Sequence, residues 1–267
     1  SLVRDKFTFM QGRIYSELNF ETKYSLVKEE ILKASKLGFL HYQLKYSVRD
    51  HWSNILSNQG NIDGLVKLCM ESNINISSIN IDITNSSRLD EAILELNKIQ
   101  KIIDSFNIQD INIAWIEKEN NINSSKMVIE ELDAVVNFFK KDVKINIETS
   151  RAAEQLFVES KFLQDNMFFT LDIGNMTFYK DRPAFVLANI PEKIGQIHLK
   201  DRTQYGQSTF FGSGDVDFEL FLNTLKGVEF SGLVVFEGFY NNNKNQVDDN
   251  YKLNAQYYDF MSSVFNC

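Results

Sequence analysis

The stretch Ile197-His198-Leu199-Lys200-Asp201-Arg202 interrupts an apolar run with a histidine and ends it on charged residues. Three other short apolar runs each end in a single acid: KINIE at Glu148, FFTLD at Asp172 and LVVFE at Glu237. Runs of this length and composition predict buried strands. Each of the four strands therefore ends in a side chain that can bind a cation, which favours a fold that brings strand ends together.

Eight candidate strands alternate with helical patterns along the chain. Their richness in Ile, Val, Phe and Leu is typical of parallel strands covered on both faces. The strands are 6–10, 38–45, 76–83, 110–116, 143–148, 167–173, 194–200 and 232–237. Apolar residues at three- and four-residue steps predict helices between them, one of which spans 89–103. Gly38 is expected to end the first helix, and Pro183 to break the short helix after the sixth strand.

Eight strands, each followed by a helix, predict the α/β class and a closed (β/α)₈ TIM barrel. We expect one domain over residues 1–267. The alternative is an open doubly wound sheet, which needs a glycine-rich phosphate-binding turn after the first strand. The residues there, Met10-Gln-Gly-Arg13, do not form that motif.

The bulk composition limits the classes of function. A formal net charge of −8 argues against non-specific nucleic-acid binding, which needs a surface rich in Lys and Arg. The sequence contains neither an apolar stretch long enough to span a membrane nor a signal-peptide pattern, and its two cysteines form no spacing motif. We expect a cytoplasmic protein that binds neither nucleic acid nor membranes, and the sequence leaves homo-oligomer formation open.

The strand ends also suggest a chemistry. In a (β/α)₈ barrel the carboxyl ends of the strands form the active-site face, so Glu148, Asp172, His198 and Glu237 would be neighbours on its rim. Three carboxylates and one imidazole suit Mn²⁺, Mg²⁺ or Zn²⁺. The alternative is that each acid is a helix N-cap or a surface group.

The chain also resembles a family. The motifs that carry the resemblance are Glu148, Asp172-Ile-Gly-Asn175, His198-Leu-Lys-Asp-Arg202, Phe211-Gly-Ser-Gly-Asp-Val-Asp-Phe218 and Glu237. They resemble the successive motifs of the xylose-isomerase-like sugar phosphate isomerase/epimerase superfamily, and Met10-Gln-Gly-Arg13 is similar to the opening motif of one branch.

The resemblance implies one divalent metal ion (Mn²⁺, Mg²⁺, Zn²⁺ or Co²⁺), bound by Glu148, Asp172, His198 and Glu237. It also implies that the two glutamates are catalytic and move a proton on a small sugar or sugar phosphate. Isomerisation or epimerisation is thus the expected activity. Two alternatives stay open: a lyase or dehydratase that uses the same enolate chemistry, and an inactive barrel that serves as a binding partner. A third, an apurinic-site endonuclease, is nearly excluded. The endonucleases need many histidines, and this chain has three.

Six further residues are candidates for substrate binding, namely Lys200, Arg13, Arg151, Trp115, Asn175 and Asp201, and the backbone of Gly212 and Gly214 is considered beside them. Lys200 could bind a substrate oxygen or phosphate, with a salt bridge to Asp172 as its alternative. Arg13 and Arg151 could bind a phosphate or carboxylate, and Gly212 and Gly214 could present backbone amides to an anion. Trp115 could pack on a sugar face or in the core, and Asp201 could orient a neighbour.

The chain departs from the family pattern at three places. Asn175 stands where several sugar epimerases carry a substrate-binding histidine. The second strand has Gln43-Leu-Lys45 where an acid is often found. His41 is expected to pack half-buried in that strand, and His51 could reach the pocket from the loop that follows.

Overall fold

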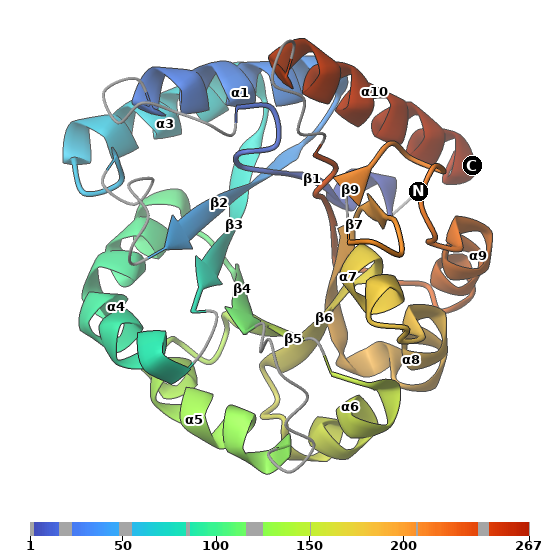
Figure 1. The fold of residues 1–267 in the computed structure, drawn as a ribbon. Coiled ribbons are helices and arrows are strands. Elements are labelled where there is room, and N and C mark those ends of the chain that lie inside the picture. The colour runs from blue at the N-terminus through green and yellow to red at the C-terminus, as the bar shows by residue number, and fades with distance from the viewer. Residues whose placement is uncertain are drawn as a thin grey trace.

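The computed structural model describes residues 3–15, 23–47, 55–83, 86–115, 125–149, 151–206, 208–239 and 246–266. Within this part of the chain, eight parallel strands close into a barrel in the order β1-β10-β7-β6-β5-β4-β3-β2. Helices form a ring around the barrel, and the blue α1 and red α10 meet where that ring closes (Figure 1). The predicted TIM barrel is confirmed.

Each predicted strand overlaps an observed barrel strand. The barrel strands are β1 (Phe7–Met10), β2 (His41–Ser47), β3 (Asn75–Asp82), β4 (Asp110–Trp115), β5 (Lys144–Thr149), β6 (Met167–Asp172), β7 (Ile194–Leu199) and β10 (Leu233–Phe236). The α-helices are α1 (Lys23–Leu37), α3 (Gln59–Ser72), α4 (Ser86–Phe106), α5 (Ser125–Phe138), α6 (Ala153–Glu159), α7 (Ile173–Phe178), α8 (Pro183–Asn189), α9 (Phe218–Gly227) and α10 (Gln246–Val264). Short 3₁₀ turns are η1 (Arg4–Lys6), η3 (Ser160–Phe162) and η4 (Pro191–Lys193), and a small hairpin is formed by β8 (Asp201–Arg202) and β9 (Ser208–Thr209).

The second strand begins at His41 rather than at residue 38, because Gly38 turns the chain out of α1. Gly38 has a φ of +109°, and the next amide, that of Phe39, closes the helix by donating to the carbonyl of Ala34 at 3.1 Å. A Cβ on Gly38 would lie 2.6 Å from the hydroxyl oxygen of Tyr258, so glycine is required there. The predicted break after the sixth strand is also present, with Pro183 as the first residue of α8.

The apolar core lies between the sheet and the helices, and the barrel interior is mostly polar. Outward-facing Ile111 and Ile113 belong to the main core, whereas Met10, Leu233 and Val235 form a small separate cluster inside. Because strand side chains alternate between faces, the other inward positions carry polar groups. The buried ones are Thr8, Gln43, Ser78, Asn80, Asn112, Asn146, Glu148, Thr170, Asp172, Gln196 and His198.

Among the described residues, no helix combines the length and the apolar character that crossing a membrane requires.

Candidate metal and proton-transfer site

The structure brings Glu148, Asp172 and His198 together at the carboxyl ends of three neighbouring strands. Glu148 lies in β5, Asp172 ends β6 and His198 lies in β7. Each offers one ligand atom, and the three atoms lie within 4.8 Å of one another. All three residues are buried. This cluster of two carboxylates and one imidazole could hold a metal ion.

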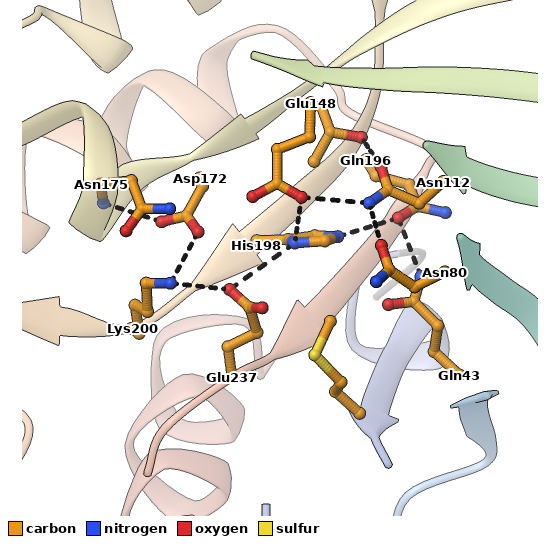
Figure 2. Close-up of polar contacts among 12 residues, drawn as sticks. Gln43, Asn80, Asn112, Glu148, Asp172, Asn175, Gln196, His198, Lys200 and Glu237 are labelled. Atoms are coloured by element: carbon orange, nitrogen blue, oxygen red, sulfur yellow. Dashed lines mark hydrogen bonds and ion pairs between the residues drawn. The ribbon is translucent and has the colours of Figure 1, made fainter. Parts of the chain in front are cut away.

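Glu237 joins the same pocket from the end of β10. Its amide continues the strand ladder by donating to the carbonyl of Leu199 at 2.9 Å. Its carboxylate accepts a hydrogen bond from Nη2 of Arg13 at 3.3 Å and another from Nζ of Lys200 at 3.2 Å. Figure 2 shows Glu237 on the Lys200 side of the His198 ring and Glu148 on the side toward Asn112. Glu237 therefore forms ion pairs with both Arg13 and Lys200 at the edge of the cluster.

Asp172 has two partners on its two oxygens. Its Oδ1 accepts from the backbone amide of Asn175 at 2.8 Å and caps α7, while its Oδ2 lies 2.8 Å from Nζ of Lys200. The helix cap considered as an alternative to metal binding is therefore present, but it uses only one oxygen. The salt bridge considered for Lys200 is present as well, and it extends to Glu237.

The two glutamates differ in their electrostatics. Burial raises the pKa of Glu148 to about 7, since His198 only partly offsets the desolvation and the charges of Glu237 and Asp172 raise the pKa further. Burial acts on Glu237 too, but the positive charges of Lys200, His198 and Arg13 outweigh it and hold the pKa of Glu237 well below its ordinary range. Of two carboxyl groups with such different pKa values, the one with the raised pKa, Glu148, is suited to hold a proton, and the one with the lowered pKa, Glu237, is suited to accept one.

The environment of the His198 ring fits a cation. Its Nε2 lies 3.1 Å from Oε1 of Gln196, while its buried Nδ1 has no hydrogen-bond partner in the described part of the chain. Nδ1 faces Oε2 of Glu148 at 3.5 Å and Oε2 of Glu237 at 3.6 Å. Burial opposes a charge on the ring, but the charges of Glu148 and Glu237 prevail and raise the pKa of His198. Two anionic oxygens around one ring nitrogen are stabilised by a positive charge between them, and a divalent metal ion would supply it.

Three sequence candidates have other partners in the structure. Arg151 forms a buried ion pair with Glu159 of α6, at 2.5 Å between Nη1 and Oε1. Trp115 is part of the main core, which matches the packing alternative. Asp201 accepts from the amides of Gly212 and Gly214, both at 2.9 Å, so the anion that these glycines bind is a side chain of the protein.

Asn175 is held at the pocket by a residue that sequence reasoning left without a role. Nη1 of Arg202 donates to Oδ1 of Asn175 at 2.6 Å, and the Arg202 guanidinium stacks on the ring of Phe178. With its oxygen engaged, the amide has only its NH₂ group left to offer a ligand. The charged pair Asp201-Arg202 directly after the histidine motif is the signal that could have indicated this support.

Glu30 of α1 is a second residue that sequence reasoning missed. Its buried carboxylate accepts from the backbone amides of Gly12, Ile14 and Tyr15 at 2.8, 3.0 and 3.1 Å. It thereby fixes the loop that brings Arg13 to Glu237. An acid on the apolar face of a helical pattern, next to Val27 and Ile31, is the sequence signal.

The histidines other than His198 lie elsewhere. His41 is half-buried at the start of β2, as expected, where its ring bonds with Oγ of Ser77 and the carbonyl of Asp5. His51 lies outside the described residues. In the second strand, Gln43 points into the barrel and donates to Ser78 and Gln196.

Comparisons with known proteins place these features in context. The family model described as xylose isomerase-like TIM barrel matches residues 31–258. No curated protein matches the sequence.

Similar solved structures share the fold at low sequence identity. One is the IOLI protein with a zinc atom (17% identity, TM-score 0.74, covering 98% of this chain and 100% of that one). Another is D-psicose 3-epimerase with D-tagatose from Clostridium cellulolyticum H10 (17%, TM-score 0.69, 98% and 100%). A third is D-allulose 3-epimerase from Methylomonas sp. in complex with D-allulose (14%, TM-score 0.70, 97% and 97%).

Proposed function

The chain belongs to the xylose isomerase-like TIM-barrel family, and on this premise we propose that it is a divalent-metal-dependent isomerase or epimerase of a small sugar or sugar phosphate. The observation that carries the proposal is the pair of glutamates on either side of His198 Nδ1, one with a raised pKa and one with a lowered pKa. The epimerases among the similar structures, which bind D-tagatose and D-allulose, support a sugar as substrate.

Glu148, Asp172, His198 and Glu237 are the residues that would hold the metal, and Mn²⁺, Mg²⁺, Zn²⁺ and Co²⁺ all suit this donor set. When bound, the ion supplies Lewis acidity that polarises a substrate carbonyl and acidifies the neighbouring C–H bond. The zinc atom in the IOLI structure supports a metal at this type of site.

The glutamates carry out the proton transfer in this proposal. The ionised Glu237 takes the proton from the carbon next to the carbonyl, and the C–H electron pair stays on the substrate as an enediolate. Glu148, whose pKa is raised to about 7, exchanges between its protonated and ionised forms near neutral pH and can therefore return a proton to the substrate, and the proton on Glu237 then leaves to solvent, which restores the pair. Return to the opposite face of the same carbon gives the epimer, whereas return to the neighbouring carbon gives the aldose or ketose isomer.

Lys200 and Arg13 bind the oxygens that carry negative charge on the substrate. Both cations already contact Glu237, so they lie within reach of a ligand bound beside it. Asn175, which lies beside Asp172, adds a further donor. Arg202 binds only the side-chain oxygen of Asn175, so the NH₂ group of Asn175 can donate to the substrate. A phosphate or a hydroxyl-rich sugar end would satisfy these donors.

The test is solvent deuterium exchange on a panel of aldoses, ketoses and their phosphates, after metal analysis of the purified protein. We expect one bound divalent ion and deuterium at the carbon next to the carbonyl. Glu148→Gln and Glu237→Gln should abolish the exchange, while Glu192→Gln, an exposed glutamate at the other end of the barrel, should not change it. Exchange at the wild-type rate in both site variants would refute the glutamate roles, and stoichiometric binding of three zinc ions would favour the endonuclease alternative.

A further inference from the structure

The polar interior of the barrel contains one hydrogen-bonded path from its amino-terminal end to the metal site. The path starts at Asp110, the first residue of β4, whose Oδ1 accepts from Nε2 of Gln196 and from Nδ2 of Asn146, both at 2.6 Å. It ends at Oε1 of Gln196, which lies 3.1 Å from Nε2 of His198. Among the described residues, Gln196 is thus the single side chain that bonds to both Asp110 and the imidazole, and Figure 2 draws its contact with His198.

The hydrogen-bond partners of Gln196 allow only one of the two orientations of its side-chain amide, in which the oxygen and the NH₂ group are not exchanged. Its NH₂ group has two hydrogens, which go to Asp110 at 2.6 Å and to Oγ of Ser78 at 3.1 Å. Its Oε1 accepts from Nε2 of Gln43 at 3.1 Å. An ionised carboxylate only accepts hydrogen bonds, so a flipped Gln196 would set its oxygen against Asp110 and its NH₂ group against the donor of Gln43.

This orientation determines which nitrogen of His198 carries the proton in the neutral ring. Oε1 of Gln196 can only accept, so Nε2 of His198 must be the donor, and Nδ1 keeps its lone pair. Nδ1 is the atom that faces Glu148 and Glu237. The lone pair is therefore aimed at the position between the carboxylates, where a metal ion would bind.

Asp110 stays ionised at neutral pH, as this argument requires. It borders a cavity at the amino-terminal end of the barrel together with Lys6 and Lys144. Burial raises its pKa to about 6, against the lowering effect of Gln196, Lys144, Asn146 and Lys6. An apolar side chain at position 110 would fill the amino-terminal end of the barrel without the cost of burying a charge. Packing alone therefore does not account for a carboxylate at this position.

We propose that Asp110 and Gln196 are positioning residues that fix the tautomer of His198, so that Nδ1 is free to bind the metal ion. Asp110 acts through Gln196 and does not itself contact His198. The inference rests on the proposed function only in taking the ligand of Nδ1 to be a metal. In Asp110→Asn the new amide can donate as well as accept, and Gln196 can then turn its NH₂ group toward His198. The proton would move to Nδ1, which blocks that nitrogen as a ligand.

The experiment uses the full chain and two independent readouts. Long-range ¹H–¹⁵N spectra report the tautomer, and with His41→Gln and His51→Gln in the background His198 is the one histidine left of three. Calorimetric titration with Zn²⁺ and with Mn²⁺ reports affinity. At a pH high enough for the His198 ring to be neutral, we expect the Nε2–H form in the reference protein and a mixture of tautomers in Asp110→Asn, together with a loss of metal affinity of about 10- to 100-fold. Asp142→Asn, an exposed aspartate at the same end of the barrel, is the matched control.

A second variant, Gln196→Leu, removes the acceptor directly and should give the same two changes. The proposal is overturned if a folded Asp110→Asn or Gln196→Leu protein keeps the Nε2–H tautomer and binds metal within twofold of the reference. If the reference protein binds no divalent ion, the proposed function fails. The tautomer spectra of the neutral ring then decide this inference alone.

Discussion

Replacing Glu30 with Gln should destabilise the protein strongly although the two side chains have the same shape. The buried Glu30 carboxylate has four donors on its two oxygens. Oε1 accepts from the amide of Gly12 at 2.8 Å and from the hydroxyl of Tyr42 at 2.6 Å. Oε2 accepts from the amides of Ile14 and Tyr15 at 3.0 and 3.1 Å. Glutamine has one oxygen, so its NH₂ group must face two of these donors in either orientation.

The magnitude follows from the bonds that are lost. Two hydrogen bonds to a charged group disappear, each contributing about 1.5–3 kcal/mol, which gives a loss of about 3–6 kcal/mol. Burial raises the pKa of Glu30, so removing its charge recovers part of this amount, and we expect the lower end of the range. Because whole domains are stable by only about 5–15 kcal/mol, about 3 kcal/mol is a large fraction.

Urea unfolding at pH 7.5 measures this loss, with Glu29→Gln as the control. Glu29 is the preceding residue of α1, is exposed, and accepts one bond from the hydroxyl of Tyr15 at 2.9 Å, so its variant should lose less than about 1 kcal/mol. A loss below about 1 kcal/mol in Glu30→Gln as well would show that the carboxylate does not hold the loop, and the link from Glu30 to Arg13 would be refuted.

Three further predictions concern the interior, the site and a close contact. The native pKa of Asp110 is raised from 3.8 to about 6, so between these pH values the native state binds more protons than the unfolded state, and the stability falls by at most about 3 kcal/mol as pH rises. In urea unfolding, the stability of Asp110→Asn relative to wild type should therefore increase between pH 4.5 and pH 7.5, and a stability difference that is the same at both pH values would contradict this. Lys200→Met removes an ammonium group from beside Asp172 and Glu237, so calorimetry should find that this variant binds Mn²⁺ roughly tenfold tighter or more than wild type. The exposed control Lys161→Met should bind Mn²⁺ like wild type, and a wild-type affinity in Lys200→Met as well would show that Lys200 does not oppose the ion. A Cβ at Gly214 would lie 2.2 Å from Oδ1 of Asp201, so Gly214→Ala should cost about 1–3 kcal/mol in thermal unfolding, whereas Gly227→Ala, with open space around the Cβ, should cost nothing.

The fold and the positions of the four charged strand ends could be predicted because they depend on local pattern. Short apolar runs identify strands, and an acid or histidine at the end of such a run identifies a rim position whatever the rest of the chain does. Glu148, Asp172, His198 and Glu237 all lie where this reasoning put them. Whether they bind metal and move protons stays a prediction.

The polar interior was visible in the sequence but was not recognised. The segments Asp110-Ile-Asn-Ile113 and Lys144-Ile-Asn-Ile-Glu148 alternate polar and apolar residues strictly, although their content of Ile favours the interpretation of strands with two apolar faces. Alternation shows that one face is polar, but it does not say whether that face looks into the barrel or toward a helix. Only closure of the barrel makes Asp110, Gln196 and His198 neighbours, because they come from β4 and β7.

The asymmetry between the two glutamates arises from the cations around Glu237, one of which is positioned from outside the site. Within the described residues, Glu148 accepts a hydrogen bond from the neutral Asn112 at 3.1 Å, and burial outweighs the charges of His198 and Lys200 in setting its pKa. Glu237 has the same length and burial, but Lys200 lies 3.2 Å from its carboxylate and lowers its pKa most, and Arg13 adds to this effect from the loop after β1. That loop is held by Glu30 of α1, whose partners in the described part of the chain are Gly12, Ile14, Tyr15 and Tyr42 rather than the residues of the site. If the roles of the two glutamates depend on this arrangement, then Glu30→Gln should raise the pKa of Glu237 and diminish the difference between the two carboxyl groups, even though every residue of the site itself is unchanged.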